Sequence, residues 1–207
     1  MYTHFWDEHV NGHHKHLATS RDPVCHEVGA NLYYAVPKAM VMTHVTSYKR
    51  EVERLIALNN GKPISIIHNL THNRMFYYFV FNFALGYTIN KTLGYKALKW
   101  QLVYSYMGAM YLESVNYLEH YGLRRRMDKS GIMESIGYQH SWSGVSSPIS
   151  FRIQRHSDHH AHKFRPYQIL RRMDKAPTMP FEYILMLFLI IFPPMYWLIN
   201  NPRVKSI

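Results

Sequence analysis

The sequence predicts an all-α fold: an integral membrane helical bundle, with about two to three membrane helices, that carries a histidine-rich extramembrane helical cap. Apolar runs at residues 75–89 and 97–118 predict the membrane helices, and three histidine clusters predict the cap. We expect a single domain over residues 1–207. Its parts are a histidine-bearing cap region at 1–62, membrane helices in 63–120, a basic cap region at 121–180, and an apolar interfacial or spanning helix at 181–199.

The composition narrows the classes of partner. The chain has 24 Lys and Arg against 13 Asp and Glu, a formal net charge of +11, which favours anionic partners. Nucleic acid is one such partner. However, 47% hydrophobic residues and long uncharged runs suit a membrane protein with basic loops better. We therefore expect membrane lipid, and no nucleic acid, as a partner.

The single Cys25 excludes an intrachain disulfide and a self-contained four-cysteine iron or zinc site. Any cysteine-ligated electron carrier must therefore be another protein.

The first cap region is expected to be helical and to lie outside the membrane. Asp22-Pro23 predicts a turn after the first histidine cluster, and apolar residues recur at helical spacing from Val24 to Leu58. The sequence Asn59-Asn60-Gly61-Lys62-Pro63 should end that helix, because it combines left-handed and helix-breaking residues.

Two membrane helices are expected in the next region. The run from Met75 to Ile89 has no charge but is slightly shorter than the ~20 residues of a spanning helix, and Ile66–Leu70 can extend it. The second run, Ala97 to Leu118, has Lys99 near one end and Glu113 near the other.

The basic cap region should face the positive, cytoplasm-like side of the membrane. Its arginine groups determine topology in one interpretation and form a docking surface for an acidic electron carrier in the other. The basic residues concerned are Arg124, Arg125, Arg126, Arg152, Arg155, Arg165, Arg171, Arg172 and Lys175. The last apolar run, from Phe181 to Ile199, contains Pro193-Pro194, so it is expected either to span or to lie kinked in the interface.

Two histidine triplets have the spacing of metal ligands on helices. In an α-helix residues four apart share a face, so His9 and His13 can address one metal while His14 addresses a second. The second triplet repeats this arrangement; it consists of His156, His159 and His160. Imidazoles suit divalent iron, copper and zinc, so the converging triplets predict a metal site.

A third motif supplies His120, at the end of the second apolar run. By itself such a histidine is more often a helix cap than a ligand. The acids beside the clusters, Glu8, Glu119 and Asp158, could each accept a ring N–H from a ligating histidine or could be solvated surface charges. The other histidines lack a repeated spacing, and His16 and His162 are the nearest alternatives among them.

These motifs resemble those of the AlkB-type alkane 1-monooxygenases, relatives of the membrane fatty acid desaturases and hydroxylases. Residues 9–14 match the family's second histidine box, Asn116–Leu123 its NYxEHYGL element, and Gln154–Ala161 its QRHSDHHA box. Shorter matches, including Asp22-Pro23, extend the resemblance over nearly the whole chain, and the middle element is the specific one because desaturases lack it.

The resemblance implies a membrane di-iron site that hydroxylates the terminal carbon of alkanes or related alkyl chains. It implies two iron ions, O₂, a hydrophobic alkyl substrate, and electrons from an external rubredoxin-like or ferredoxin-like protein. The implied metal ligands are His9, His13, His14, His120, His156, His159 and His160. No catalytic residue is expected beyond this metal site.

The family's first box, HExxHK, would lie upstream of His9, where this sequence has only eight residues. We therefore expect the C-terminal half of such an oxygenase, completed by a companion chain with the first box and early membrane helices. Two alternatives remain: a fragment of a longer product, or a noncatalytic AlkB-like structural subunit of a larger membrane complex. An organellar complex would place it in the mitochondrial inner membrane.

Overall fold

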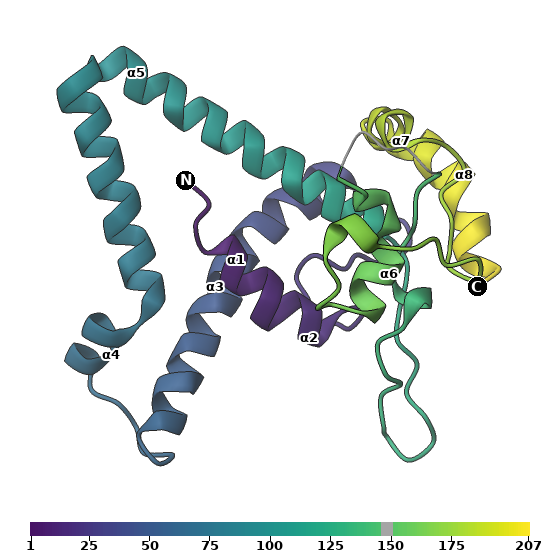
Figure 1. The fold of residues 1–207 in the computed structure, drawn as a ribbon, viewed down its shortest axis with the longest axis horizontal. Helices are drawn as coiled ribbons and strands as arrows, with labels where there is room; N and C mark the ends of the chain where they lie inside the picture. Colours follow the sequence, from purple (N-terminus) through teal and green to yellow (C-terminus); the bar gives the residue numbers. More distant parts are fainter. Residues whose placement is uncertain (146–150) are drawn as a thin grey trace. The chain divides into compact units, whose positions relative to one another are not determined.

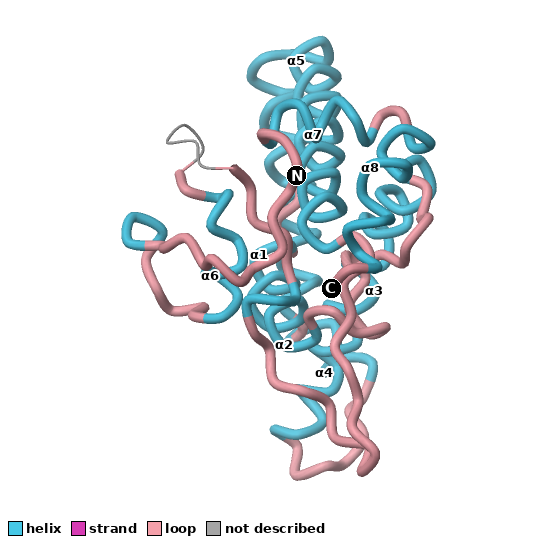
Figure 2. The backbone as a smooth tube through the Cα atoms, turned by 90° about the vertical axis from the view of Figure 1, so that its right-hand side faces the viewer, coloured by secondary structure: helices cyan, strands magenta, loops and turns pink. Residues whose placement is uncertain are grey.

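The computed structural model describes residues 1–145 and 151–207. The described chain is helical, as predicted, and its β-structure is limited to two isolated bridges, Met127 with Met133 and Ser143 with Thr178 (Figures 1 and 2). The helices belong to two compact units, one of residues 1–12 and 40–111 and the other of residues 13–39 and 112–207. We describe each unit by itself.

The first histidine cluster does not form the predicted α-helix. Short α-helices α1 (Phe5–Asp7) and α2 (His14–His16) flank a π-helical segment, η1 (Glu8–His13). A π-helix forms i to i+5 hydrogen bonds, so each of its backbone bonds joins residues five apart rather than four. The expected α-helical backbone of this cluster is therefore replaced by a π-helical one.

Helix α3 (Leu32–Leu58) ends where its sequence predicts, but it begins eight residues later than the helical spacing from Val24 indicated. Asn60 and Gly61 follow it with φ of 55° and 77°, the left-handed conformation that terminates helices. Helix α4 (Ile66–His72) is short, and Ser65 caps it by accepting a hydrogen bond from the His68 N–H.

The two apolar runs lie in one long helical element, α5 (Arg74–His120), which is broken at Gly94. Gly94 has φ 83° and ψ 169°, a conformation that is essentially restricted to glycine. The break thus separates the two predicted helices close to the expected place.

The second unit is completed by short elements. These are η2 (Tyr138–His140), η3 (Ile153–Arg155), α6 (His156–Ala161), η4 (Tyr167–Ile169), α7 (Tyr183–Ile190) and α8 (Pro193–Lys205). The last two replace the single helix expected at 181–199 and pack against each other (Figure 1). Pro193 and Pro194 begin α8, where their missing N–H groups cost no helical hydrogen bond.

The prediction of two to three membrane helices was wrong. Within the described ranges, none of the helices combines the length and the apolar character needed to cross a membrane. Asn82, Asn90 and Lys91 interrupt the first part of α5 with polar groups. Helix α7 is strongly apolar, but its eight residues extend only about 12 Å, against a hydrocarbon core of about 30 Å.

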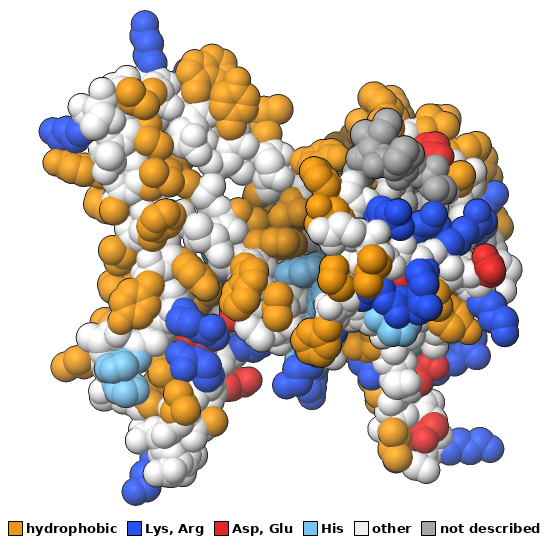
Figure 3. Space-filling model, in the orientation of Figure 1, with side chains coloured by type: hydrophobic (Ala, Val, Ile, Leu, Met, Phe, Trp, Pro, Cys, Tyr) orange, Lys and Arg blue, Asp and Glu red, His pale blue; other side chains and the backbone are white. Residues whose placement is uncertain are grey.

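Buried ion pairs stabilise the first unit. Asp7, Glu8 and Glu51 are each at most 2% exposed. Arg50 donates to Glu8 at 2.7 Å, and Arg74 donates to Glu51 at 2.5 Å. Because buried carboxylates need such partners, the network ties the N-terminal segment to α3 and α5 within this unit. By contrast, many apolar side chains of α5 remain exposed on its surface (Figure 3).

Tyrosines form the centre of the second unit. Tyr117, Tyr121 and Tyr196 are at most 1% exposed, and their ring centroids lie 4.9–5.7 Å apart. The Tyr117 hydroxyl donates to the Ala30 carbonyl at 2.7 Å, which satisfies its buried polar atom. These contacts hold the end of α5 against α8 and thereby fix the position of His120, which lies between Tyr117 and Tyr121 in the sequence.

Candidate metal centre

His120 is the last residue of α5, and its place depends on how that helix ends. Gly122 adopts φ 75° and donates its N–H to the His26 carbonyl at 2.8 Å. A Cβ at this position would lie 2.8 Å from a methyl carbon of Val204. The glycine of the NYxEHYGL element therefore serves both a left-handed helix terminus and a close approach.

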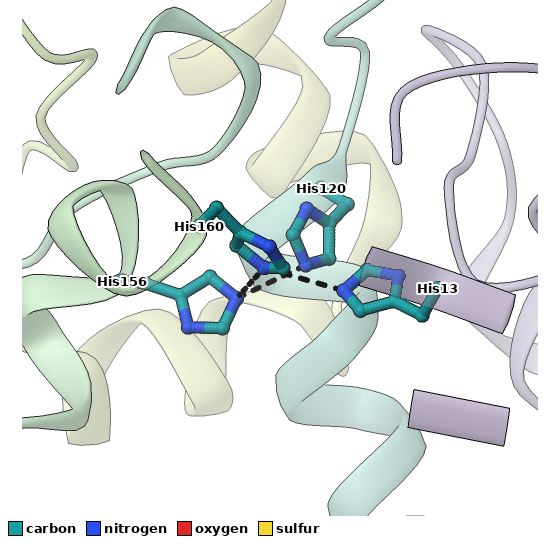
Figure 4. A group of neighbouring side chains, drawn as sticks. All are labelled: His13, His120, His156 and His160. Carbon is teal, nitrogen blue, oxygen red and sulfur yellow. Dashed lines mark hydrogen bonds between the residues drawn. The ribbon is translucent and has the colours of Figure 1, made fainter. Parts of the chain in front are cut away.

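Helix α6 presents its histidines because both of its polar neighbours are anchored. Ser157 donates to the Ser141 carbonyl at 2.7 Å and contacts the Ser143 hydroxyl at 2.8 Å. Asp158, which is fully buried, accepts hydrogen bonds from Arg165 at 2.5 and 2.6 Å. These contacts hold α6 in place, and the imidazoles of its His156 and His160 point to one place (Figure 4).

Four imidazoles from three segments converge in the second unit (Figure 4). The Nε2 atom of His160 lies 3.2 Å from that of His13 and 2.9 Å from that of His156. The Nε2 atom of His156 in turn lies 3.1 Å from that of His120. All four residues are at most 5% exposed, so the group is shielded from water.

The donor set fits a metal ion better than it fits a set of hydrogen bonds. A ring nitrogen offers either one hydrogen or one lone pair, so four nitrogens can make at most about two N–H···N bonds among themselves. Three contacts of hydrogen-bond length are present. Nitrogens bound to one ion at about 2.1 Å lie roughly 3.0–3.4 Å apart. The observed spacings of 2.9–3.2 Å are close to that range.

The electrostatics also favour neutral, ligating rings. Burial lowers the pKa of His120 and of His160 well below the usual value, and nearby imidazoles, including that of His13, lower both further. Neutral imidazole is the form that coordinates metals, since protonation removes its lone pair.

A second pair of predicted histidines lies beside this group. The Nε2 atoms of His14 and His159 are 3.0 Å apart, and the His159 and His160 ring centroids are 5.2 Å apart. Burial lowers the pKa of His14 to about 3, assisted by His13 and His159. The second unit thus brings together six of the seven predicted ligands. The seventh, His9, belongs to the first unit, where its ring stacks on that of Phe5.

Glu119 is the predicted acid that approaches the four-histidine group. One carboxylate oxygen lies 3.2 Å from the Nε2 atom of His156, and the other accepts a hydrogen bond from the Tyr183 hydroxyl at 2.8 Å. Burial raises the pKa of Glu119 well above its usual value, although the hydrogen bond from Tyr183 opposes this rise. Tyr183, at the start of α7, was not predicted, because it belongs to none of the histidine motifs.

The other two predicted acids contact different partners from those expected. Glu8 accepts from Thr46, Ser47 and Arg50 in the first unit. Asp158 contacts the ring of His162, which is not among the predicted ligands, at 2.8 Å. Both carboxylates therefore stabilise the local fold.

The acid that contacts a predicted ligand from behind is Asp22. Its Oδ2 atom lies 2.7 Å from the Nδ1 atom of His13 and 2.9 Å from the Cys25 sulfur. Burial alone would raise the pKa of Asp22, but its interaction with His13 and the hydrogen bonds from His13 and Cys25 hold the pKa at about 2. Sequence reasoning identified Asp22-Pro23 only as a turn. The signal that it missed was a carboxylate nine residues after His13.

Comparisons with known proteins identify the family of the chain. The sequence pattern of the family described as "Fatty acid desaturase" matches residues 1–190. Alkane 1-monooxygenase 2 of Alcanivorax borkumensis is 33% identical over 99% of this chain and 53% of its own length. Alkane 1-monooxygenase 2 of Pseudomonas aeruginosa is 34% identical over 99% of this chain and 54% of its own length.

The xylene/toluene monooxygenase hydroxylase component XylM of Pseudomonas putida is 26% identical over 96% of this chain and 52% of its own length. The chain thus spans about half the length of the curated relatives that it matches. The resemblance to alkane 1-monooxygenases found in the histidine motifs is confirmed. This chain belongs to the fatty acid desaturase family.

Proposed function

We propose that the chain supplies part of a di-iron centre for the O₂-dependent hydroxylation of the terminal carbon of an alkyl chain. The observation that supports this most strongly is the convergence of the buried Nε2 atoms of His13, His120, His156 and His160. In the overall reaction one oxygen atom enters a C–H bond and the other leaves as water, which requires two electrons and two protons from outside. Iron, when bound, would supply the redox chemistry that activates O₂.

The residues of this chain hold and shield that chemistry. His13, His120, His156 and His160 would hold one ion, and the neighbouring His14 and His159 would contribute to a second. Tyr183 orients Glu119 toward His156, and the buried surroundings exclude water from the ligands. Neutral imidazoles leave the positive charge of the metal uncompensated, so a bound ion would oppose the effect of burial on the pKa of Glu119 and favour its carboxylate form.

A companion chain is part of the proposal. The similarity covers about half of each alkane 1-monooxygenase, and the HExxHK box of the family is not found in the sequence. A companion with that box would complete the ligands around the second ion. Exposed apolar residues on α4 and α5, such as Ile66, Phe79 and Phe83, would contact membrane lipid, the hydrophobic substrate or the companion.

An external electron-transfer protein of the rubredoxin or ferredoxin type would supply the electrons. Arg171 and Arg172 have side chains 61% and 64% exposed, so they are available to an acidic carrier. The guanidinium of Arg125, by contrast, donates to the Glu134 carbonyl at 2.8 Å and helps to hold the loop.

The proposal predicts a separation of kinetic effects in the chain assembled with its companion. His156→Ala should abolish alkane hydroxylation because it removes an iron ligand. Arg172→Ala should leave the maximal rate within about twofold and raise the carrier concentration needed, since exposed charges act mainly on association. Hydroxylation would be measured as terminal alcohol formed from an n-alkane while the carrier concentration is varied. Equal losses in both variants would contradict the separate roles, and an iron-free wild-type assembly would support a noncatalytic subunit.

A further inference from the structure

The imidazole of His13 has two nitrogens with different surroundings. Its Nε2 atom faces the four-histidine group, 3.2 Å from the Nε2 atom of His160. Its Nδ1 atom faces the Asp22 carboxylate at 2.7 Å. Both side chains are almost completely buried, at 2% and 0% exposure, so water does not compete for this contact.

The Asp22 carboxylate is itself held on both oxygens. Oδ1 accepts the Val24 N–H at 3.1 Å, which closes the turn that begins at Asp22-Pro23. Oδ2 accepts the Cys25 S–H at 2.9 Å in addition to the His13 N–H. The Cys25 sulfur in turn accepts the Ala18 N–H at 3.2 Å. The carboxylate therefore receives three hydrogen bonds and has a single orientation.

We infer that Asp22, oriented by Cys25, is a positioning residue that keeps the proton of His13 on Nδ1 and aims the Nε2 lone pair into the metal centre. A carboxylate behind a ligating histidine is the arrangement that fixes the tautomer and raises ligand basicity in metal sites. The inference rests on the proposed metal centre, but the tautomer that it specifies exists with or without a metal.

The geometry predicts that asparagine cannot take over the role of Asp22. The Val24 N–H requires an acceptor at the Oδ1 position, so the amide oxygen of an asparagine would remain there. Its NH₂ group would then face Nδ1 of His13 and donate to it. His13 would have to carry its proton on Nε2 instead, and that proton would block the lone pair that ligates the metal.

A different interpretation of the same atoms is an ion bound between His13, Asp22 and Cys25 themselves, whose ligand atoms lie within 4.8 Å of one another. Such an ion would bind a Cys25 thiolate. In our account Cys25 remains a thiol that donates to Asp22, in keeping with the burial and the neighbouring carboxylate that raise its pKa.

The test uses the purified chain, Co²⁺ as the probe ion, and ¹⁵N-histidine NMR of the metal-free protein. Asp22→Asn should weaken Co²⁺ binding by about 10–100-fold and move the His13 proton from Nδ1 to Nε2. Cys25→Ala should weaken binding by a smaller factor, and Cys25→Ser, which keeps a donor, should restore it. Asp174→Asn is the matched control because Asp174 is 95% exposed, and it should bind Co²⁺ as the wild type does.

Unchanged affinity and an unchanged His13 tautomer in Asp22→Asn would overturn the inference. A sulfur-to-cobalt charge-transfer band in the wild type that disappears in Cys25→Ala would also overturn it, because the thiolate would then be a ligand. If Asp22→Asn does not fold, the two Cys25 variants decide. A loss of Co²⁺ affinity in Cys25→Ala that is restored in Cys25→Ser supports the role of Asp22. Equal Co²⁺ affinities in Cys25→Ala and the wild type contradict it. A wild type that binds no Co²⁺ would refute the metal centre, while the NMR tautomer would still test Asp22.

Discussion

Gly122 shows how a single position sets the end of α5 and thus the place of His120. Gly122 has φ 75°, and a Cβ added to it would lie 2.8 Å from Val204. Gly122→Ala should therefore lower the free energy of unfolding by about 2–3 kcal/mol. Gly131→Ala is the control, since Gly131 has φ 79° but no neighbour within 4 Å, and it should cost only about 1 kcal/mol. Urea unfolding measures both. Equal costs would mean that the contact with Val204 is unimportant.

His26 should make stability depend on pH. Burial lowers its pKa to about 4, and its buried Nε2 atom has no hydrogen-bond partner among the described residues. The pKa of His26 in the folded chain lies below its unfolded value near 6.5. The contribution of the neutral His26 to stability is therefore fully present above pH 6.5. It should fall by up to ~1.4 kcal/mol per pH unit as the pH drops toward 4. His26→Phe should remove only this contribution and make the dependence shallower in urea titrations of the metal-free chain, because His14, His120 and His160 also have lowered pKa values. Identical slopes for variant and wild type would refute this role.

At the residue scale, the sequence identified the histidines that come together far better than the groups that contact them. Histidine spacing is a local property, so the triplets could be read directly, and His120 followed from its motif. Asp22, Tyr183 and Cys25 act through contacts between distant or irregular segments, which no periodicity records. Glu8 and Asp158 were assigned by proximity in sequence, whereas burial required each of them to pair with arginine instead.

At the scale of elements, the break in α5 depends on Gly94. Its φ of 83° and ψ of 169° should make Gly94→Ala destabilising by about 1–3 kcal/mol. Gly108→Ala in the same helix is the matched control: nothing lies within 4 Å of its would-be Cβ, and alanine favours helix by about 0.5–1 kcal/mol. Thermal unfolding followed by circular dichroism should therefore shift in opposite directions. A stabilised Gly94→Ala variant would show that the break is not needed.

The existence of helices was predictable from sequence, but their environment was not. The helix-breaking segment Asn59–Pro63 predicted the end of α3. The two apolar runs, 75–89 and 97–118, predicted the two parts of α5. The inference of membrane-crossing helices gave too much weight to uncharged aromatic residues, since tyrosine and asparagine add polar groups without adding charge. The π-helical backbone of η1 was also invisible, because a sequence pattern does not distinguish i+4 from i+5 bonding.

At the scale of the whole molecule, the proposed metal centre gathers segments that are far apart in sequence. His13 and His160 are 147 residues apart, and His120 and His156 are 36 apart, yet their nitrogens approach within 3.2 Å. Tertiary packing alone achieves this, which is why spacing could suggest two triplets but not which four imidazoles converge. Completion of the site by a companion stays a proposal, supported by the half-length similarity rather than by any one contact.

The central claim is that His13, His120, His156 and His160 hold a metal ion, and iron content tests it most directly. The purified chain, loaded with Fe²⁺ without oxygen and freed of excess metal, should retain about one iron at this group, and about two with its companion. The double variant His156→Gln/His160→Gln, with wild-type helical content by circular dichroism, should lose the iron of this group. Iron absent from the wild type, or equal in wild type and variant, would contradict the account.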